Sequence, residues 1–332
     1  MSDITRVVLA LTQLQGIGNQ TIIKGLRNIN LQEITDEFSF LNKINSNKIQ
    51  KKLDNETISV MDWHNALSLA DDIINKSKEK GIGTVSFLDE DYPKNLLMVH
   101  DEKYPAILYF KGDIKQINDH KSLAVIGTRN ITEFGNEMTS KYVKYFTSKD
   151  YVIVSGLAKG TDAKAHEETI KNSGKTIAIL AAGLDQTIYP KENAPLAKEI
   201  LRTGGALISE YKIGTKLFPQ FLVARDRWQS GISDGVIAIE TGTRGGTKNA
   251  MTAAGYQKRP LGCPDAKEYL DVDFDELPKT SIGTEEFIEK GLAIPLYTNR
   301  SVKGFRLHLE EEKERREEIF REQKSVEDIN LF

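Results

Sequence analysis

The sequence predicts an α/β protein built on a parallel sheet, and three observations carry this prediction. The segments 123–126 and 152–155 are almost entirely apolar and do not alternate with polar residues, as expected for strands buried on both faces. Each segment ends in a glycine turn, and sequence with helical character follows. Consecutive strand–turn–helix units direct their turns to one edge of a parallel sheet, where backbone N–H groups and helix N-termini can bind phosphate.

Residues 1–80 are predicted to form a helical domain. The segments Val7–Leu11 and Thr21–Leu26 are apolar and periodic, and Gly16 and Gly18 form a turn between them. This order predicts a helix-hairpin-helix element of the SAM-like type. Its glycines would let backbone N–H groups approach a DNA phosphate, or they would only permit the backbone of a tight turn. The rest of this domain is predicted to be a polar loop over 45–55 and a helix over 58–80.

The sheet domain is predicted over residues 81–295, with its core at 121–262. Short strands are expected at 84–88 and 106–110, before the core. Core strands are predicted at 123–126, 152–155, 176–180, 206–209 and 236–239, with a shorter one at 260–263. Helices are predicted between them at 133–148, 162–172, 195–203 and 247–257. The charged segment 296–332 is predicted to be a helical tail, in which 309–324 forms an exposed helix with i,i+4 ion pairs or docks a partner.

The composition is ordinary for a soluble globular protein. Of the 332 residues, 39% are hydrophobic and 28% are charged, and no apolar run approaches the length of a membrane span. The N-terminus lacks the pattern of a secretory signal, and Cys263 is the only cysteine. We therefore expect a cytoplasmic protein without intramolecular disulfides. The five histidines show no metal-ligand spacing, so neither a metal nor a cofactor is expected.

The formal net charge of −3 hides an asymmetry along the chain. Residues 121–263 contain 20 basic and 13 acidic residues, whereas residues 309–332 contain 5 basic and 9 acidic ones. A basic middle region is typical of a domain that binds a polyanion. The alternative is a chance distribution of charges over a solvated surface.

The second glycine turn has the composition of a phosphate-binding loop. Glycines remove Cβ atoms that would block an approaching anion, and lysine supplies a positive charge. Asp162 is predicted to cap the following helix, and His166, one helical turn later, could donate to phosphate or sugar. Alternatively, His166 is a core residue that satisfies a buried carbonyl. The candidate residues in this turn and helix are Ser155, Gly156, Lys159, Gly160, Asp162 and His166.

Further candidate phosphate ligands lie in three other segments. Gly127 and Arg129 follow the first core strand, where Arg129 suits bidentate phosphate binding or an ion pair at the sheet edge. Arg225 and Arg227 form a second basic cluster, and a base could stack on the adjacent Trp228. A last turn resembles the start of a helix that binds an anion, and its candidate residues are Gly245, Gly246, Thr247 and Lys248.

These segments, in their order and spacing over roughly residues 85–295, resemble the DNA-processing protein A (Smf) family. The resemblance implies an extended Rossmann-like fold. It also implies a homodimeric single-stranded-DNA-binding protein that loads a RecA-like recombinase onto incoming DNA during natural transformation. The segments that carry it are 89–93, 105–112, 127–129, 155–162 with Ala165 and His166, 183–185, 189–190, 192–193, 209–211, 218–219, 225–227, 231–233, Glu240 and 245–247.

The chain departs from this family at three points. The family's usual Arg-Asn-Arg is Arg225-Asp226-Arg227 here, which adds a negative charge to the expected DNA groove. Trp228 replaces an aliphatic residue. The C-terminal tail is also too short and too charged for the winged-helix domain that the family often carries.

No catalytic set stands out in the sequence, and we expect no enzymatic activity. The conceivable acid–base groups are Asp162, Asp185, Glu210 and Glu240. Glu240 precedes a glycine turn that is similar to those of nucleotide-hydrolysing proteins with the same sheet, although there the glutamate follows the glycines. A nucleotide-binding sensor or nucleosidase, for example in phage defence, is therefore the alternative function. A scaffold with a vestigial anion site is the third.

Overall fold

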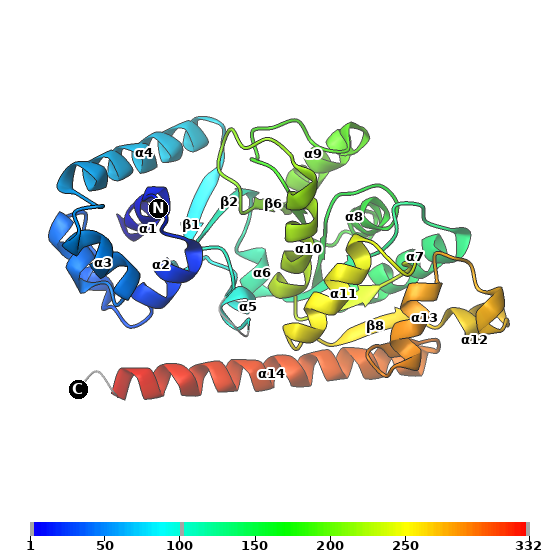
Figure 1. Cartoon of the computed structure of the whole chain (residues 1–332). Coiled ribbons are helices and arrows are strands. Elements are labelled where there is room, and N and C mark those ends of the chain that lie inside the picture. Colours follow the sequence, from blue (N-terminus) through cyan, green and yellow to red (C-terminus); the bar gives the residue numbers. More distant parts are fainter. Residues whose placement is uncertain (1–2, 100–102, 330–332) are drawn as a thin grey trace.

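The computed structural model describes residues 3–99 and 103–329, and in these ranges one mixed sheet organises the protein (Figure 1). The strand order is β1-β2-β6-β5-β4-β3-β7-β8-β9. The pairs from β6 to β9 are parallel, whereas β1–β2 and β2–β6 are antiparallel. The strands are β1 (Gly83–Ser86), β2 (Ile107–Gly112), β3 (Lys121–Ile126), β4 (Tyr151–Ser155), β5 (Thr176–Leu180), β6 (Ala206–Ser209), β7 (Gly235–Ala238), β8 (Leu261–Pro264) and β9 (Ile294–Leu296).

All predicted strands are present, with ends that differ by at most two residues. The chain passes from β3 outward through β4, β5 and β6 and then returns to place β7 on the other side of β3. This reversal creates a topological switch point between β3 and its two parallel neighbours. In open α/β sheets, ligands bind beyond the carboxyl ends of the strands at such a point. The fold thus confirms the predicted extended Rossmann-like architecture.

Helices cover both faces of the parallel strands. On one face, alternate residues such as Leu123 and Val125 pack against Met138 and neighbouring side chains of α7. On the other face, Ala124 packs with Met251 of α11. Strands buried on both sides must be apolar throughout, which explains their non-alternating sequences. The helices here are α7 (Glu133–Thr147), α8 (Thr161–Lys171), η4 (Lys191–Asn193), α9 (Ala194–Arg202), α10 (Pro219–Ile232) and α11 (Gly246–Tyr256), of which only η4 and α10 were not predicted.

The N-terminal region is helical, as predicted, and contains the helix–turn–helix hairpin. Gly16 has a φ of +77° in the turn, a conformation that glycine adopts without steric cost. The predicted loop over 45–55 is wrong, because Ser46 accepts a hydrogen bond from the Ile49 N–H and thereby starts a helix. The elements are α1 (Asp3–Gln13), α2 (Asn19–Leu26), η1 (Leu31–Glu33), η2 (Phe38–Lys43), α3 (Asn47–Asp54) and α4 (Val60–Glu79).

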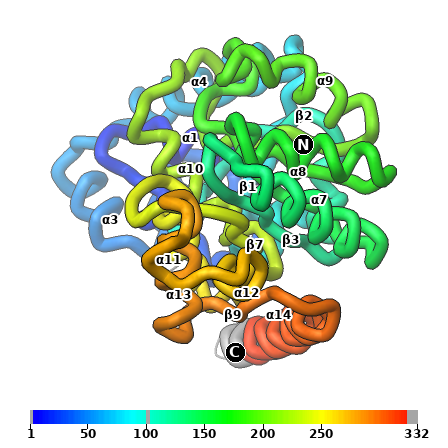
Figure 2. The backbone as a smooth tube through the Cα atoms, turned by 90° about the vertical axis from the view of Figure 1, so that its right-hand side faces the viewer, coloured from blue at the N-terminus to red at the C-terminus, as the bar shows by residue number. Residues whose placement is uncertain are grey.

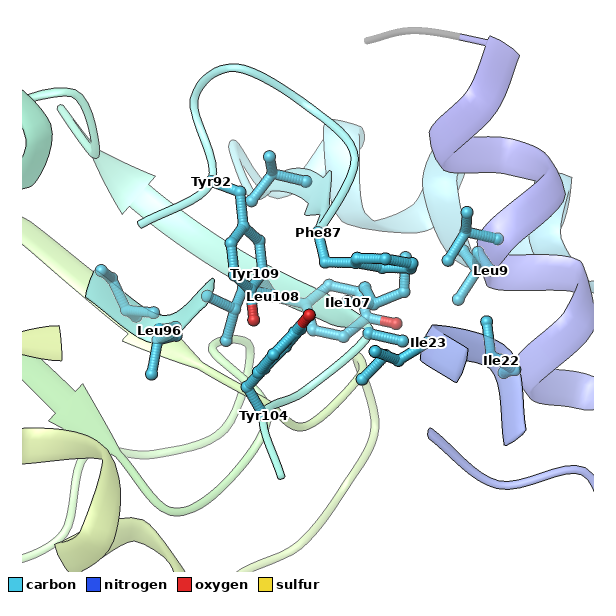
Figure 3. Close-up of a cluster of buried hydrophobic side chains, with 14 of the residues drawn as sticks. Leu9, Ile22, Ile23, Phe87, Tyr92, Leu96, Tyr104, Ile107, Leu108 and Tyr109 are labelled. Carbon is cyan, nitrogen blue, oxygen red and sulfur yellow. The ribbon is translucent and has the colours of Figure 1, made fainter. Parts of the chain in front are cut away.

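The N-terminal helices share their hydrophobic core with the antiparallel extension of the sheet (Figure 3). Leu9 and Ile22 of the hairpin lie in the same cluster as Phe87 and Tyr109, from the region of β1 and β2. A continuous core fixes the hairpin relative to the sheet domain. Two short helices, α5 (Lys94–Leu97) and α6 (Gln116–Asp119), lie along the connections that flank β2.

The C-terminal segment extends the sheet and ends in a long helix that runs along the edge of the molecule (Figures 1 and 2). The tail predicted from residue 296 begins inside β9, and its helix starts ten residues earlier than expected, at Asn299. Phe305 and Leu309 are fully buried. The first half of this helix therefore packs against the rest of the protein and is not an exposed helix. The i,i+4 pairing predicted for residues 309–324 is present between Lys313 and Glu317, whose charged atoms lie 4.0 Å apart. These elements are α12 (Ala266–Leu270), η5 (Phe274–Glu276), α13 (Ile282–Glu289) and α14 (Asn299–Ile329).

Candidate nucleic-acid interface

The first two glycine turns meet at the carboxyl edge of the sheet, as predicted. A Cβ on Gly127 would lie 2.3 Å from the Thr161 hydroxyl, so only glycine allows this approach. Gly160 has a φ of +76°, and a Cβ there would lie 2.4 Å from the Thr128 carbonyl oxygen. The Thr161 N–H donates to the same carbonyl at 3.1 Å. The glycines therefore bring the start of α8 against the turn that follows β3.

Arg129 and Lys159 are exposed cations in the turns after β3 and β4. Arg129 projects from the turn after β3 and is exposed. Lys159 projects from the turn after β4, and its ammonium lies 2.8 Å from a carboxylate oxygen of Glu192. This pair is solvent-exposed on both sides, so it contributes little stability and a phosphate can replace the carboxylate.

A pocket open to solvent separates these cations from the start of α10. Its walls are largely apolar and include Leu180, Ile188, Leu217 and Leu222, whereas Arg129, Lys159 and Arg225 supply the charge. Together with the space at its mouth, the pocket encloses about 650 Å³. The loop that follows β5 forms one wall and carries the exposed side chain of Tyr189. These wall residues were absent from the predicted site. Segments 183–185 and 189–190, which belong to this loop, were noted only for their resemblance to the family.

Arg225 connects two walls of the pocket through hydrogen bonds to the backbone. Its guanidinium donates to the carbonyl oxygens of Gly156 and Ile179, the latter at 2.8 Å, and the residue is only 4% exposed. A Cβ on Gly156 would overlap this guanidinium, which explains the glycine. Arg225 therefore contributes positive potential to the pocket, while one of its two terminal nitrogens is engaged by backbone carbonyls.

Ser155 and Asp162, two of the predicted ligand residues, are buried and form hydrogen bonds within the fold. Ser155 donates to the Val125 carbonyl at 2.7 Å, which ties β4 to β3. The helix cap is Gly160 and not Asp162, whose carboxylate accepts from the Ala158 N–H. Burial raises the pKa of Asp162, although the nearby Arg225 opposes the shift.

His166 is a core residue, so its predicted role as a donor to phosphate or sugar is wrong. It is fully buried, and its Nδ1 lies 2.7 Å from the Thr176 hydroxyl. That hydroxyl donates to the Ile153 carbonyl and therefore accepts from Nδ1–H of the histidine. Burial, and then the charge of Arg225, lower the pKa of His166 to about 3, so the ring stays neutral at physiological pH.

Asp226 lies between the pocket and the last glycine turn. One carboxylate oxygen lies 3.2 Å from Nε of Arg225. A Cβ on Gly246 would lie 2.4 Å from the other oxygen, so this carboxylate faces the start of α11. Burial raises the pKa of Asp226 to about 6, because it outweighs the opposing charges of Arg225 and Arg129. An anionic ligand at the N-terminus of α11 would therefore lie next to the Asp226 carboxyl group.

The remaining predicted cations differ in their availability. Lys248, in the first turn of α11, pairs with Glu286 of α13 at 2.9 Å. Arg227 is exposed, and its guanidinium lies 4.2 Å from the ring centroid of Trp228. Trp228 itself is buried and donates to Glu210 at 2.9 Å. The expectation that a base stacks on this indole is therefore wrong. At the turn where α11 begins, Gly245 is exposed and Thr247 is half-buried.

Glu240 has a structural position. It is fully buried, and its carboxylate accepts from the N–H and hydroxyl of Thr132 at 3.0 and 2.7 Å. The hydroxyls of Thr280 and Ser281 lie 3.2 and 3.4 Å from the same carboxylate. Glu240 therefore fixes the start of α7 and the loop before α13, and it does not line the pocket.

Residues 3–99 and 103–329 contain neither a candidate metal site nor a candidate membrane-spanning helix. No group of three or more His, Cys, Asp or Glu side chains in these ranges is placed to hold a metal ion. None of the helices in the same ranges combines the length and hydrophobicity that crossing a bilayer requires.

A parallel sheet with a topological switch point and a cationic pocket beyond its strand ends defines the class of Rossmann-like ligand-binding proteins. Residues 83–303 match the family described as DNA recombination-mediator protein A, and the chain belongs to this family. Most of α14 lies beyond the matched region.

Known relatives agree with this assignment. Over 185 residues, the chain is 36% identical to DNA processing protein DprA of Bacillus subtilis and 32% identical to Protein Smf of Escherichia coli. These matches cover 56% and 54% of this chain, and 60% and 48% of the relatives. The chain thus spans about half the length of these proteins, or somewhat more.

Two solved structures are similar over most of their own length. DNA processing protein A of Streptococcus pneumoniae has a TM-score of 0.69 at 25% identity, covering 90% of this chain and 97% of that one. DNA processing protein A of Helicobacter pylori has a TM-score of 0.57 at 26% identity, covering 69% and 96%. The latter structure was described for its single-stranded DNA binding mode.

Proposed function

We propose that this protein binds single-stranded DNA at the carboxyl edge of its sheet. The observation that carries the proposal is the pocket, which has apolar walls and a rim that bears Arg129 and Lys159. Apolar walls suit an unstacked base, and the two cations suit the phosphates on either side of it. The bases of a duplex are stacked and paired, so a duplex does not offer such a base without paying the cost of unstacking.

Aromatic side chains near the pocket support the same ligand. Tyr189 and Phe218 are exposed near its mouth, and Phe218 packs edge-on against Phe221 at a centroid distance of 5.3 Å. Aromatic rings next to cations are typical of sites that bind single strands with little sequence preference.

The finer role follows from the family and is part of the same proposal. The protein acts as a homodimer in the cytoplasm, and it loads a RecA-like recombinase onto incoming DNA during transformation. In this role it holds and transfers the strand, and we propose no catalytic step. Family membership and the relatives named above support this role.

A titration of labelled single strands, duplex and mononucleotides tests the proposal. We expect single strands to bind more tightly than the other two, with log affinity falling by about 0.7 per phosphate contact for each decade of salt. Affinity that does not change with salt would remove the electrostatic basis of the site. Recombinase loading is tested separately, by whether the protein speeds assembly of a RecA-like filament on the same strand.

Asp226 favours one second candidate, a mononucleotide-binding sensor or nucleosidase with a role in phage defence. A carboxyl group beside a cationic pocket can accept a hydrogen bond from a ribose hydroxyl, whereas it repels a continuous phosphate backbone. Tight mononucleotide binding, with weak binding of single strands, would favour this candidate over the first.

A further inference from the structure

The helical hairpin and the helix beside it carry an excess of positive charge that the pocket does not use. Residues 14–53 include six basic and three acidic residues, and the acidic ones lie in the connection between α2 and η2. In α3, three lysines stand against one acidic residue, Asp54, at its last position. The basic residues are Lys24, Arg27, Lys43, Lys48, Lys51 and Lys52. A local charge density of this kind on a small helical unit is typical of a surface that contacts a polyanion.

The cations lie close to the glycine turn of the hairpin. A Cβ on Gly16 would lie 3.5 Å from the ammonium nitrogen of Lys52, so this lysine extends along the turn. Lys48 precedes it by one turn of α3 and is exposed. Gly18, directly before α2, is exposed, and a Cβ there would meet nothing within 4 Å. A phosphate can therefore reach the backbone N–H groups here without steric obstruction.

The nearby acidic side chains are partly used elsewhere. Glu33 lies 3.4 Å from Lys43, and Asp36 lies 2.9 Å from Arg6. Asp54, the last residue of α3, and Glu56, two residues further on, are exposed and reduce the potential there. The cationic surface is therefore centred on Lys48, Lys52 and the turn.

A direct contact connects the hairpin to the pocket. Lys212, in the loop after β6, donates from its ammonium to the side-chain oxygen of Gln13 at 2.9 Å. Gln13 is the last residue of α1, three residues before Gly16. The same loop contains the exposed Lys216 and continues to Leu217, which lines the pocket. Lys212 therefore contacts the hairpin, and Lys216 directly precedes a residue that lines the pocket.

This loop is also held in place at its start. Tyr211 stacks on Phe221 of α10, with ring centroids 4.2 Å apart and an interplanar angle of 23°. Residues 211–218 contain two lysines and no acidic residue. A strand that leaves the pocket in this direction meets only positive or neutral side chains of the loop.

We propose that single-stranded DNA leaving the pocket crosses Lys212 and Lys216 and binds the hairpin surface formed by Gly16, Gly18, Lys48 and Lys52. The hairpin is then a second contact for the same strand, and it makes affinity depend on strand length. This inference rests on the proposed function, because it extends the path of a ligand that the pocket holds.

The test compares oligothymidylates of about 6 and about 20 nucleotides, since single-strand sites commonly span about 4–16 nucleotides. In the wild type we expect the longer strand to bind about tenfold more tightly or better, after correction for the number of sites. The Lys48→Gln/Lys52→Gln variant should lose most of this gain and bind the short strand as the wild type does. Its salt slope with the long strand should fall by about 1.4, because two phosphate contacts are lost.

A matched control removes two exposed lysines from the opposite side of the sheet domain, Lys144→Gln/Lys149→Gln, where α7 ends. It has the same change in net charge, so a general effect of charge would appear equally in both variants. Thermal unfolding verifies that both remain folded, and exposed Lys→Gln changes should leave it nearly unchanged.

The outcomes separate this inference from the proposed function. If neither strand binds the wild type, the proposed function fails. If both strands bind but the hairpin variant keeps the wild-type ratio, or the control loses as much, the hairpin inference is overturned while the pocket remains. A hairpin variant that loses affinity for duplex alone would also overturn it, because the surface would then bind another ligand.

Discussion

Asp226 and Gly246 face each other between α10 and α11. A Cβ on residue 246 would lie 2.4 Å from a carboxylate oxygen of Asp226, so the two groups would overlap. The same carboxyl group lies 3.2 Å from Nε of Arg225. A buried acid therefore connects the cationic pocket to the glycine turn at the start of α11.

Replacing Asp226 with asparagine should tighten DNA binding. The change keeps the volume and removes a charge that would repel a phosphate about 6 Å away by about 2–3 kcal/mol at an effective dielectric of about 20, before solvent and salt screening reduce it. We expect a several-fold gain for single strands at low salt, measured by fluorescence anisotropy. A protein that senses nucleotides through this residue should instead bind mononucleotides more weakly, with DNA binding unaffected. No change with either ligand would place Asp226 outside the site.

DNA affinity should rise as the pH falls from about 7.5 to about 5.5. The raised pKa of Asp226, about 6, means that its carboxyl group becomes neutral over this interval and stops repelling phosphate. His166 has a pKa of about 3 and does not charge here, and Glu192 remains ionised because Lys159 lowers its pKa. Burial raises the pKa of Asp162 too, so Asp226→Asn is the necessary control. An equal pH step in that variant would assign the effect to another group.

Arg129→Ala should weaken binding of single strands by about tenfold while leaving thermal unfolding unchanged. Arg129 is exposed, and a charged hydrogen bond to phosphate contributes about 1.5–3 kcal/mol before solvent screening reduces it. The measurement is a binding titration combined with a melting curve. Wild-type affinity in this variant would place the phosphate contacts elsewhere on the edge.

Arg225→Ala should behave differently, because it should lower the melting temperature as well as the affinity. It removes a buried guanidinium and leaves the carbonyls of Gly156 and Ile179 without their donor. Unsatisfied buried polar groups cost about 1–3 kcal/mol each. A variant that melts like the wild type would show that these carbonyls find water, and that Arg225 acts on the ligand alone.

Leu309→Ala should destabilise the protein, although it lies in the most charged segment of the chain. Leu309 is fully buried at the contact of α14 with β7, where a Cβ on Gly235 would lie 2.1 Å from its side chain. Truncation of a buried leucine costs about 2–5 kcal/mol. Leu307→Ala is the matched control, since Leu307 is 43% exposed and should change stability by less than about 0.5 kcal/mol. Equal urea midpoints for the two variants would mean that α14 is not packed in solution.

The sheet was predictable because its signals are local. Apolar, non-alternating runs such as Leu123–Ile126 define strands that are covered on both faces, and a glycine directly after β3 and after β4 marks the turn. The helix α10 was not predicted. Its segment interrupts an apolar pattern with Arg225, Asp226 and Arg227, and it is helical because Trp228 and Arg225 are buried by β5, the turn after β4 and α11. Intrinsic helix propensity does not predict a helix that is stabilised by tertiary packing.

By itself, the sequence determined the strands of the parallel core, four of the helices between them and the edge at which the glycine turns meet. Periodicity and glycine chemistry act over a few neighbouring residues, and parallel connectivity then directs the turns to one side. Only the tertiary structure decided which of the similar arginines is free. Arg129 is exposed, whereas Arg225 is bound to one carbonyl in the turn after β4 and one in β5, and His166 is enclosed by β4 and β5. Exposure and hydrogen-bond partners depend on segments that are far apart in the chain, and their distances are set only when the core closes.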